Sequence, residues 1–429
     1  MRTVRVGLIG LGTVGSGVVE ILRRHREDFA TRAGVDIELA RYADRDASRF
    51  ARLGLPPEAC TTDAAEIIAD ADIDVVIELI GGTGAARGVV LAALEAGKSV
   101  VTANKALMAS HGQEVMDAAE AHGVDLMFEA SVGGGIPIIG PLKHSLVSNE
   151  ITAVYGIVNG TTNFMLTQMT RDGLDYATAL TEAQARGYAE ADPSADVDGL
   201  DAAAKIAILA SIAFNSRVTL GDVPAEGIRS ITPVDIAYAT EMGYVIKLMA
   251  IARRVEGGVD VRVHPTMIRS GHPLAKVDAV YNAIYVVGDA VGETMFFGEG
   301  AGSLPAASAI VGDVIEVARH IQSGCLNIVG CTCREELPVR EIGDLVTQYY
   351  VRLLVEDRPG VLAKVAQIFG ENDVSLASVL QTRTDEHGGA EIVWVTHAAA
   401  ERDVRAALDA IALLDVVREV ASVIRVEEL

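Results

Sequence analysis

The stretch VRVGLIGLGTVG, residues 4–15, decides the fold of the first part of the chain. An apolar, strand-like run ends at Gly10-x-Gly12-x-x-Gly15, and a helical pattern follows it directly. Glycines at this spacing let backbone amides approach a pyrophosphate at a helix N-terminus. A merely structural turn is the alternative, but a strand before the motif and a helix after it favour dinucleotide binding.

Repeated strand–helix units continue this pattern to about residue 130. Strand-like apolar runs at residues 37–45, 75–80, 98–103 and 124–130 alternate with helical segments. Such alternation predicts a parallel, doubly wound sheet of the Rossmann type. We predict a dinucleotide-binding domain over residues 1–130, completed by an amphipathic helix over residues 305–325 that returns to it.

Beyond residue 130 the pattern is that of an α+β domain. A glycine-rich loop at 131–140, a long apolar helix at 199–214 and strand-like runs between 261 and 300 predict a catalytic and dimerisation domain over 131–304. Its apolar, strand-rich surface predicts a homo-oligomer. Residues 326–348 are predicted to be a linker, and residues 349–429 follow the βαββαβ order of a ferredoxin-like domain.

Composition limits the partners and the compartment. A net charge of −23 argues against nucleic-acid binding, because a nucleic-acid binder needs clustered cations. We find no apolar run long enough to cross a membrane, and the strand near the N-terminus leaves no room for a signal peptide, so we expect a cytoplasmic protein. The four cysteines suit a reducing compartment. Cys331-Thr-Cys333 is at most half of a metal site, and the simpler interpretation is a pair of free thiols in a linker.

The span GYAEADPSADVDGLDAAAK, residues 187–205, is the strongest indication of chemistry. Five acidic residues precede Lys205, and the apolar run 206–213 follows it. A lysine between carboxylates and a buried helix can give a proton to a carbonyl oxygen or take one from an alcohol. Asp201 and Lys205 could instead be an ordinary stabilising helix pair. The nearby cofactor motif and the apolar helix favour the catalytic interpretation.

Two further segments are candidates for cofactor contact. Asp44 ends the second predicted strand; an acid there favours a ribose hydroxyl and hence NAD, whereas the adjacent Arg45 could hold a 2′-phosphate and hence NADP, and the sequence leaves this open. Thr102 and Lys105 follow the strand-like run 98–101, at the sheet edge where ligands of α/β proteins bind. A solvated lysine at a helix start is the alternative for Lys105.

Taken together, these motifs resemble those of homoserine dehydrogenase. The resemblance covers residues 1–325, and the segments that carry it, in order, are GLGTVG, VTANKALMA, EASVGGGIPII, GIVNGTTNFML, GYAEADPSADVDGLDAAAKI and GEGAGSLPAASA. From Tyr349 the chain looks like an ACT domain, with EDRPGVL as its strand-to-helix turn. The two parts together are similar to the monofunctional bacterial enzyme with a regulatory tail.

The resemblance implies NAD- or NADP-dependent interconversion of L-homoserine and L-aspartate 4-semialdehyde, in the synthesis of threonine, methionine and isoleucine from aspartate. Lys205 would be the proton donor or acceptor, with Lys105 near the reacting centre. Substrate would be held by Glu190, Asp196 and Asp201. The residues implied to face the cofactor are Gly10, Thr13, Val14, Lys105, Gly187 and Gly302.

The resemblance also implies a structural sodium ion and an allosteric ligand. The ion would bind the Glu129 carboxylate and the backbone carbonyls of Val132, Gly134 and Ile136. Threonine is the expected effector of the tail. The alternative is that the tail is an oligomerisation module that binds nothing. A homodimer or homotetramer is expected.

Thr83-Gly84 and Ala306 depart from the family pattern beside the cofactor cleft. A non-catalytic dinucleotide sensor and a dehydrogenase of another small aldehyde remain competing interpretations.

Overall fold

The computed structural model describes residues 2–328, 330–333, 335–384 and 389–429. The chain forms two compact units, which are described separately. The first comprises Met1–Val158, Ala204–Val223 and Tyr281–Leu337. The second comprises Asn159–Ala203, Pro224–Val280 and Pro338–Leu429.

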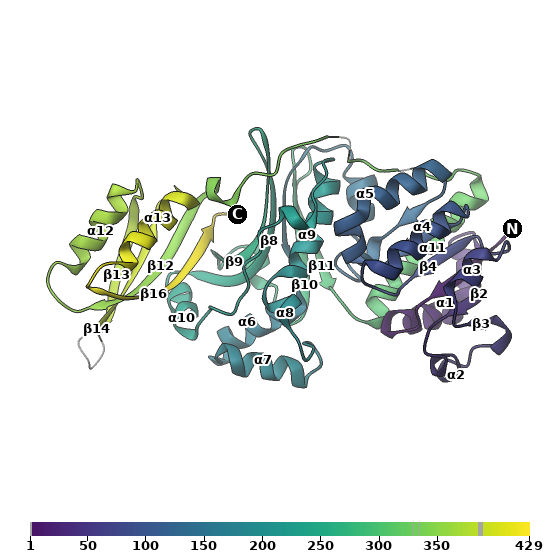
Figure 1. Ribbon diagram of the computed structural model, residues 1–429, viewed down its shortest axis with the longest axis horizontal. Coiled ribbons are helices and arrows are strands. Elements are labelled where there is room, and N and C mark those ends of the chain that lie inside the picture. Colours follow the sequence, from purple (N-terminus) through teal and green to yellow (C-terminus); the bar gives the residue numbers. More distant parts are fainter. Residues whose placement is uncertain (1, 329, 334, 385–388) are drawn as a thin grey trace. The chain divides into compact units, whose positions relative to one another are not determined.

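A six-stranded parallel sheet in the order β3-β2-β1-β4-β5-β6 is the frame of the first unit (Figure 1). This order confirms the predicted doubly wound sheet. The four predicted runs after β1 correspond to β2, β4, β5 and β6. The short edge strand β3 was not predicted, because two residues show no periodicity. The elements are β1 (Thr3–Ile9), α1 (Thr13–Arg32), β2 (Asp36–Ala43), α2 (Ser48–Arg52), β3 (Cys60–Thr61), α3 (Ala64–Ala69), β4 (Val75–Glu78), α4 (Gly84–Glu95), β5 (Ser99–Thr102), α5 (Lys105–His122) and β6 (Leu126–Met127).

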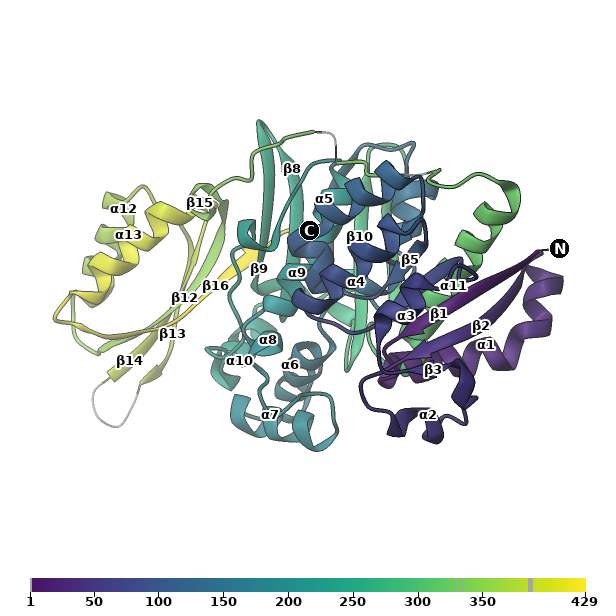
Figure 2. The ribbon, with the colours of Figure 1, turned by 45° about the vertical axis from the view of Figure 1, so that its right-hand side comes forward.

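Helix α11 (Ser303–Ser323) belongs to the core of this sheet, although it lies about 180 residues beyond β6 in the chain. Its buried face, which includes Ile310, Val314 and Val317, packs in one cluster with Val6 of β1 and Val18 of α1. Figure 2 shows β1 and β2 side by side with α1 along them. A Cβ on Gly17 would lie 2.7 Å from the Ser303 carbonyl oxygen, so the small residue permits the close α1–α11 approach.

The rest of the first unit includes three antiparallel strands and most of an apolar helix. The strands β7 (Ile151–Ile157), β10 (Tyr281–Gly288) and β11 (Gly292–Glu299) pair in the order β11-β10-β7. The helix α9 (Leu200–Ala213) begins in the second unit and continues in the first. Alanine, isoleucine and leucine make up most of it, so it is suited to burial on every side.

The second unit combines helices with a long hairpin. Its helices are α6 (Gly160–Asp172), α7 (Tyr176–Ala185), α8 (Ser194–Val197) and α10 (Pro233–Glu241). The hairpin consists of β8 (Tyr244–Val255) and β9 (Gly258–Arg269), which pair antiparallel along their whole length. In the part of the chain that the structure describes, each helix is too short or too polar to cross a bilayer.

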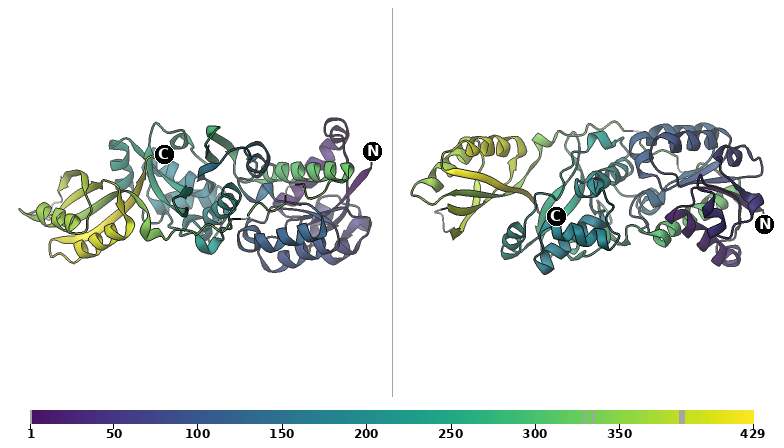
Figure 3. Two further views of the ribbon diagram at one scale, coloured as in Figure 1. Left: turned by 90° about the horizontal axis from the view of Figure 1, so that it is seen from above. Right: turned by 60° about the horizontal axis from the view of Figure 1, so that its bottom comes forward.

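The C-terminal part of the second unit confirms the predicted βαββαβ order. It consists of β12 (Val346–Glu356), α12 (Val361–Glu371), β13 (Leu376–Thr384), β14 (Gly389–Thr396), the short β15 (Ala399–Ala400), α13 (Glu401–Ala412) and β16 (Val417–Glu427). The antiparallel order is β16-β12-β14-β13. Figure 3 shows the two helices, green and yellow, on one face of these strands. Their core includes Phe369 and Trp394, whose ring centroids are 5.7 Å apart.

Candidate active site

The glycine-rich turn joins β1 to α1 and is closed by backbone contacts. Gly10 has φ +101°, and a Cβ there would lie 2.6 Å from the Leu79 carbonyl oxygen. A Cβ on Gly15 would lie 2.0 Å from the Gly10 carbonyl oxygen. The first turn of α1 carries no acidic side chain, so its positive end can receive an anion such as a pyrophosphate. The turn therefore has the close backbone geometry that dinucleotide binding requires.

Gly302 lies beside this turn. It precedes α11 with φ +128°, a conformation that favours glycine. The hydroxyl of the next residue, Ser303, donates to the Thr13 carbonyl oxygen at 2.6 Å. The structure thus brings together two predicted cofactor residues, Thr13 and Gly302, that are far apart in sequence.

Asp44 is fixed at the end of β2 and faces the cofactor cavity. Its carboxylate accepts from the Leu11 backbone N–H at 2.7 Å and from the Arg49 guanidinium at 3.0 Å. A cavity of about 580 Å³ is lined by Gly10, Asp44, Arg45 and Arg49, among others. Arg49 was not predicted, because α2 is too short to show a periodic pattern. A cation beside the acid reduces the negative charge that a 2′-phosphate would meet.

Thr102 connects the ends of two neighbouring strands. Its hydroxyl donates to the Glu78 carboxylate at 2.7 Å and accepts from the Asn104 backbone N–H at 3.0 Å. Both Thr102 and Glu78 are fully buried. Asn104 caps α5 by accepting from the Leu107 N–H, which fixes the start of the helix at Lys105. The Thr102 hydroxyl is therefore engaged within the protein and positions the loop; a direct cofactor contact stays a prediction. Glu78 was missed, although an acid ending the apolar strand VVIE was a usable signal.

Lys205 lies on the buried part of α9. The residue is 8% exposed, and its Nζ donates to the Val158 carbonyl oxygen at 2.6 Å. Val158 follows β7 directly, so the strand end fixes the position of the ammonium group. Helix residues on both sides of Lys205 are almost or fully buried: Ala203, Ala204, Ile206 and Ala207. The predicted burial of this amine is confirmed.

Two of the predicted substrate acids meet at an asparagine that was not predicted. The Asn159 amide donates to Asp196 at 2.7 Å and to Asp201 at 2.9 Å. The Thr161 hydroxyl donates to Asp196 at 3.0 Å, and the Asn159 side-chain oxygen accepts from the Thr162 N–H at 2.9 Å to cap α6. The Asn159 amide thus holds the two carboxyl groups close together. Such a group attracts a cation like the ammonium of an amino acid.

The other acids of the span 187–205 do not join this group of contacts. Glu190 is exposed. Hydrogen bonds from Ser194 lower the pKa of Asp192, and a hydrogen bond from Arg229, opposed by burial, lowers the pKa of Asp198. These two aspartates stabilise the loop locally. A substrate contact of Glu190 stays a prediction.

Gly187 has φ +75° in an exposed turn of the second unit. It ends the turn that follows α7, where its N–H donates to the Gln184 carbonyl oxygen at 3.0 Å. This conformation favours glycine. Its predicted contact with the cofactor, like that of Val14 in the first unit, is untested.

The Glu129 carboxylate holds the start of a helical turn. It accepts from three consecutive backbone N–H groups, those of Ile138 and Ile139 on one oxygen and that of Gly140 on the other, at 2.6–2.8 Å. A carboxylate has about four acceptor sites, so three amide donors leave room for one more contact, and the predicted role of Glu129 as a cation ligand stays a prediction. Over the described residues no group of three or more His, Cys, Asp or Glu side chains is arranged to bind a metal. A site formed by the carbonyls of Val132, Gly134 and Ile136 stays a prediction.

Comparisons with known proteins agree with this geometry. Family models match three parts of the chain: "Homoserine dehydrogenase, NAD binding domain" over residues 10–129, "Homoserine dehydrogenase" over 137–315 and "ACT domain" over 349–412. Homoserine dehydrogenases of Synechocystis and Bacillus subtilis are 50% and 43% identical, over 99–100% of this chain and 99% of each relative.

Two solved structures are also similar. A homoserine dehydrogenase from Thiobacillus denitrificans has a TM-score of 0.94 and 42% identity, and covers 100% of this chain and 99% of its own. A hyperthermophilic archaeal homoserine dehydrogenase in complex with NADPH has a TM-score of 0.64 and 26% identity, and covers 74% of this chain and 98% of its own.

Replacing Asn159 by Asp tests the carboxylate pair. The substitution keeps an oxygen for the cap of α6 but adds a third carboxylate beside Asp196 and Asp201. We expect the free energy of unfolding to fall by about 3 kcal/mol at pH 7, because buried polar groups lose their donor and like charges meet. The loss should shrink toward pH 4, where carboxylates take up protons. Urea denaturation at both pH values measures it.

Asn163→Asp is the matched control. The new carboxylate would lie on the same helix but beside the Lys247 ammonium, which donates to the Asn163 side-chain oxygen at 3.1 Å. This variant should lose much less stability at pH 7 than Asn159→Asp. Equal losses, or no pH dependence for Asn159→Asp, would contradict the assignment of Asn159.

Proposed function

The chain belongs to the homoserine dehydrogenase family of NAD(P)-dependent oxidoreductases, and we propose that it interconverts L-homoserine and L-aspartate 4-semialdehyde with Lys205 as the proton-transferring group. The observation that carries this proposal is the buried ammonium at 2.6 Å from the Val158 carbonyl, on an apolar helix that also bears Asp201. The nicotinamide, when bound, supplies or accepts the hydride. Lys205 would give a proton to the aldehyde oxygen as the alcohol forms, and take it back in the reverse direction.

The two carboxylates on Asn159 suit the other end of the substrate. Asp196 and Asp201 would receive the α-ammonium group through charge-assisted hydrogen bonds. Fixing that group determines where the far carbon of a four-carbon amino acid lies, and orientation of this kind accounts for a large part of the rate that an enzyme gains. Lys105, at the start of α5, is proposed to lie near the reacting centre, and Glu190 to contribute to substrate binding.

We propose that the cofactor cavity accepts NADPH as well as NADH. Asp44 is hydrogen-bonded to the Leu11 N–H and paired with Arg49, so its charge is already compensated on one side. Arg45 and Arg49 both line the cavity and can meet a 2′-phosphate. We further propose that cofactor binding maps to residues 1–130 with helix 305–325, and catalysis to residues 131–304.

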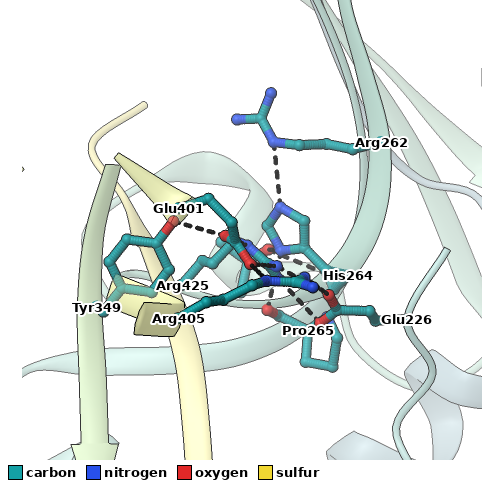
Figure 4. A network of polar contacts seen from close by, with 9 residues as sticks. Glu226, Arg262, His264, Pro265, Tyr349, Glu401, Arg405 and Arg425 are labelled. Atoms are coloured by element: carbon teal, nitrogen blue, oxygen red, sulfur yellow. Dashed lines mark hydrogen bonds and ion pairs between the residues drawn. The ribbon is translucent and has the colours of Figure 1, made fainter. Parts of the chain in front are cut away.

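The C-terminal domain, residues 349–429 after the linker 326–348, is proposed to bind threonine and to regulate the reaction. Support comes from a network of ion pairs in the second unit, centred on the buried Arg425 (Figure 4). Arg425 of β16 donates to both oxygens of Glu401 at 2.7 and 2.8 Å, and to both oxygens of Glu226 at 2.8 Å. Burial raises the pKa of Glu401, but the charge and hydrogen bonds of Arg425 outweigh it, so the pKa is lowered and the ion pair is maintained.

The loop that carries Glu226 contacts the backbone beside Asp196, one of the proposed substrate-binding acids. Its own N–H donates to the Val263 carbonyl of β9 at 2.8 Å, and the N–H of Ile228 donates to the Val197 carbonyl at 2.9 Å. A Cβ on Gly227 would lie 2.0 Å from that carbonyl oxygen, so the two backbones are in direct contact. Val197 follows Asp196. A change at the start of α13 can therefore reach Asp196 through one arginine and one short loop.

Self-association into a homodimer or homotetramer remains a proposal as well. The edge strand β11 exposes Met295 and Phe297 to solvent, and Phe297 packs against the exposed Tyr281 of β10. An exposed apolar edge of this kind is a typical contact between subunits. Light scattering of the purified chain decides between one copy and several.

Substituting Lys205 by Met tests the catalytic assignment. We expect kcat to fall by about 10²- to 10⁴-fold, the usual contribution of a positioned acid–base group. Binding of NADPH, followed by its fluorescence, should stay within about twofold, because the cofactor turn is untouched. Lys276→Met, at an exposed lysine, is the control and should keep normal turnover. A kcat within tenfold of the unsubstituted enzyme for Lys205→Met would refute the role.

Arginine substitutions test cofactor preference. Arg45→Ala and Arg49→Ala should each raise KM for NADPH by about tenfold, since a charge-assisted contact is lost, and leave KM for NADH nearly constant. Arg52→Ala is the matched control, because Arg52 lies on α2 together with Arg49. Arg52 pairs with Asp46 and does not line the cavity. Equal effects on both cofactors would exclude recognition of the 2′-phosphate.

Glu226→Gln tests the regulatory connection without removing the tail. Glu226 is half-exposed, so its neutralisation should be tolerated while one charge of the Arg425 network disappears. We expect basal kcat to hold and the threonine concentration for half-inhibition to rise at least about fivefold, the lower end of ordinary allosteric coupling. Glu256→Gln, at an exposed glutamate of the β8–β9 turn, is the control. An unchanged inhibition curve would show that coupling bypasses Glu226.

A further inference from the structure

Two cysteines of the predicted linker share a small cavity in the first unit. Cys331 and Cys333 line a space of about 60 Å³ between residues of α5 and α9. The Cys331 sulfur lies 4.0 Å from the Gln113 side-chain oxygen, and the Cys333 sulfur lies 3.4 Å from the Ser211 carbonyl oxygen. Both thiols are free and half-buried. A cavity of this volume has room for a few water molecules or for one small hydroperoxide.

The surroundings favour a thiolate on one of the two sulfurs. The Cys333 side chain and backbone N–H donate to Cys331, and although burial opposes them they lower the pKa of Cys331 to about 6. The ammonium of Lys143, which also lines the cavity, adds positive charge and lowers it further. Burial and the neighbouring sulfur raise the pKa of Cys333, which stays a thiol. One reactive sulfur thus has a protonated partner two residues away.

We propose that Cys331 is a thiol-modification site for small hydroperoxides, with Cys333 as the resolving thiol. The Cys331 thiolate attacks one peroxide oxygen, the O–O bond breaks, and the leaving oxygen takes up a proton as water or an alcohol. The resulting sulfenic acid is attacked by the Cys333 sulfur; an S–S bond forms, and the sulfenic oxygen leaves as water with the thiol proton. Two thiols are oxidised, and one hydroperoxide is reduced.

The chain geometry permits this disulfide. Residues two apart span at most about 7 Å between Cα atoms, and disulfides need about 4.4–6.8 Å, so the spacing of the two cysteines is compatible with a disulfide. Cys60 lacks these features: its pKa is raised by burial, with a further contribution from Glu58. Cys325 is exposed and lies outside the cavity. The proposal does not rest on the dehydrogenase activity, and its test measures the sulfur atoms themselves.

The test treats the full-length protein with a small excess of hydrogen peroxide at pH 7, followed by trypsin digestion and mass spectrometry. Peptide 320–334 contains Cys325, Cys331 and Cys333. We expect its mass to fall by about 2 Da, the loss of two hydrogens, and to recover after reduction. Cys325→Ser should keep this shift. In Cys333→Ser the shift should disappear, and dimedone should trap a sulfenic acid on Cys331.

Lys143→Gln supplies a second readout. Alkylation of Cys331 by iodoacetamide should reach half of its maximal rate near pH 6 in the unsubstituted protein and at higher pH in this variant, because the nearby cation is lost. The proposal is overturned if peroxide leaves both linker thiols reduced, if the disulfide includes Cys325, or if dimedone labels Cys325 in place of Cys331.

Discussion

The contacts made by two consecutive residues, Val158 and Asn159, hold the polar side chains on which the proposed chemistry depends. The carbonyl of Val158 accepts from the Lys205 ammonium, and the amide of Asn159 donates to Asp196 and Asp201. A cation and a pair of anions are therefore fixed by neighbouring peptide units at the end of β7. Both contacts come from neutral groups of the backbone or of an amide side chain, so they position the ammonium and the two carboxylates without adding a charge of their own. Burying such groups is costly, and the apolar length of α9 supplies packing that offsets the cost.

Much of the framework could be predicted from the sequence, because it depends on local patterns. Apolar runs ending in glycine or in polar residues identified β1, β2, β4, β5 and β6, and the βαββαβ order identified the C-terminal domain. The length of α9 and the burial of Lys205 followed from a charge-free run of residues. Periodicity fails for very short elements, and so β3 and α2 were missed, and with α2 the residue Arg49 that pairs with Asp44.

The contacts that each acidic residue makes could not be predicted, because they depend on partners that are distant in sequence. Asp198 lies in the same span as Asp196, yet it pairs with Arg229, 31 residues away. Asp196 instead meets Asn159, 37 residues earlier. The Glu129 carboxylate was predicted only as a cation ligand, and the three amide donors that it meets at the start of the helical turn just after Ile138 could not be predicted. Composition of a segment predicts its polarity, and only the fold determines which polar groups meet.

The C-terminal domain is joined to its unit by buried charges as well as by strand pairing. The end of β16 pairs in parallel with β9, from Arg425 opposite Thr266 to Glu427 opposite Ile268. Glu427 accepts from the buried Arg262 at 2.6 Å, and Arg352 of β12 donates to the fully buried Asp235 at 2.8 Å. Removing the tail would take these partners away from Arg262 and Asp235 and would destabilise whichever of the two charges stayed buried. The C-terminal domain is thus an integral part of the second unit, because its last strand pairs with β9 and its buried charges hold partners outside the domain.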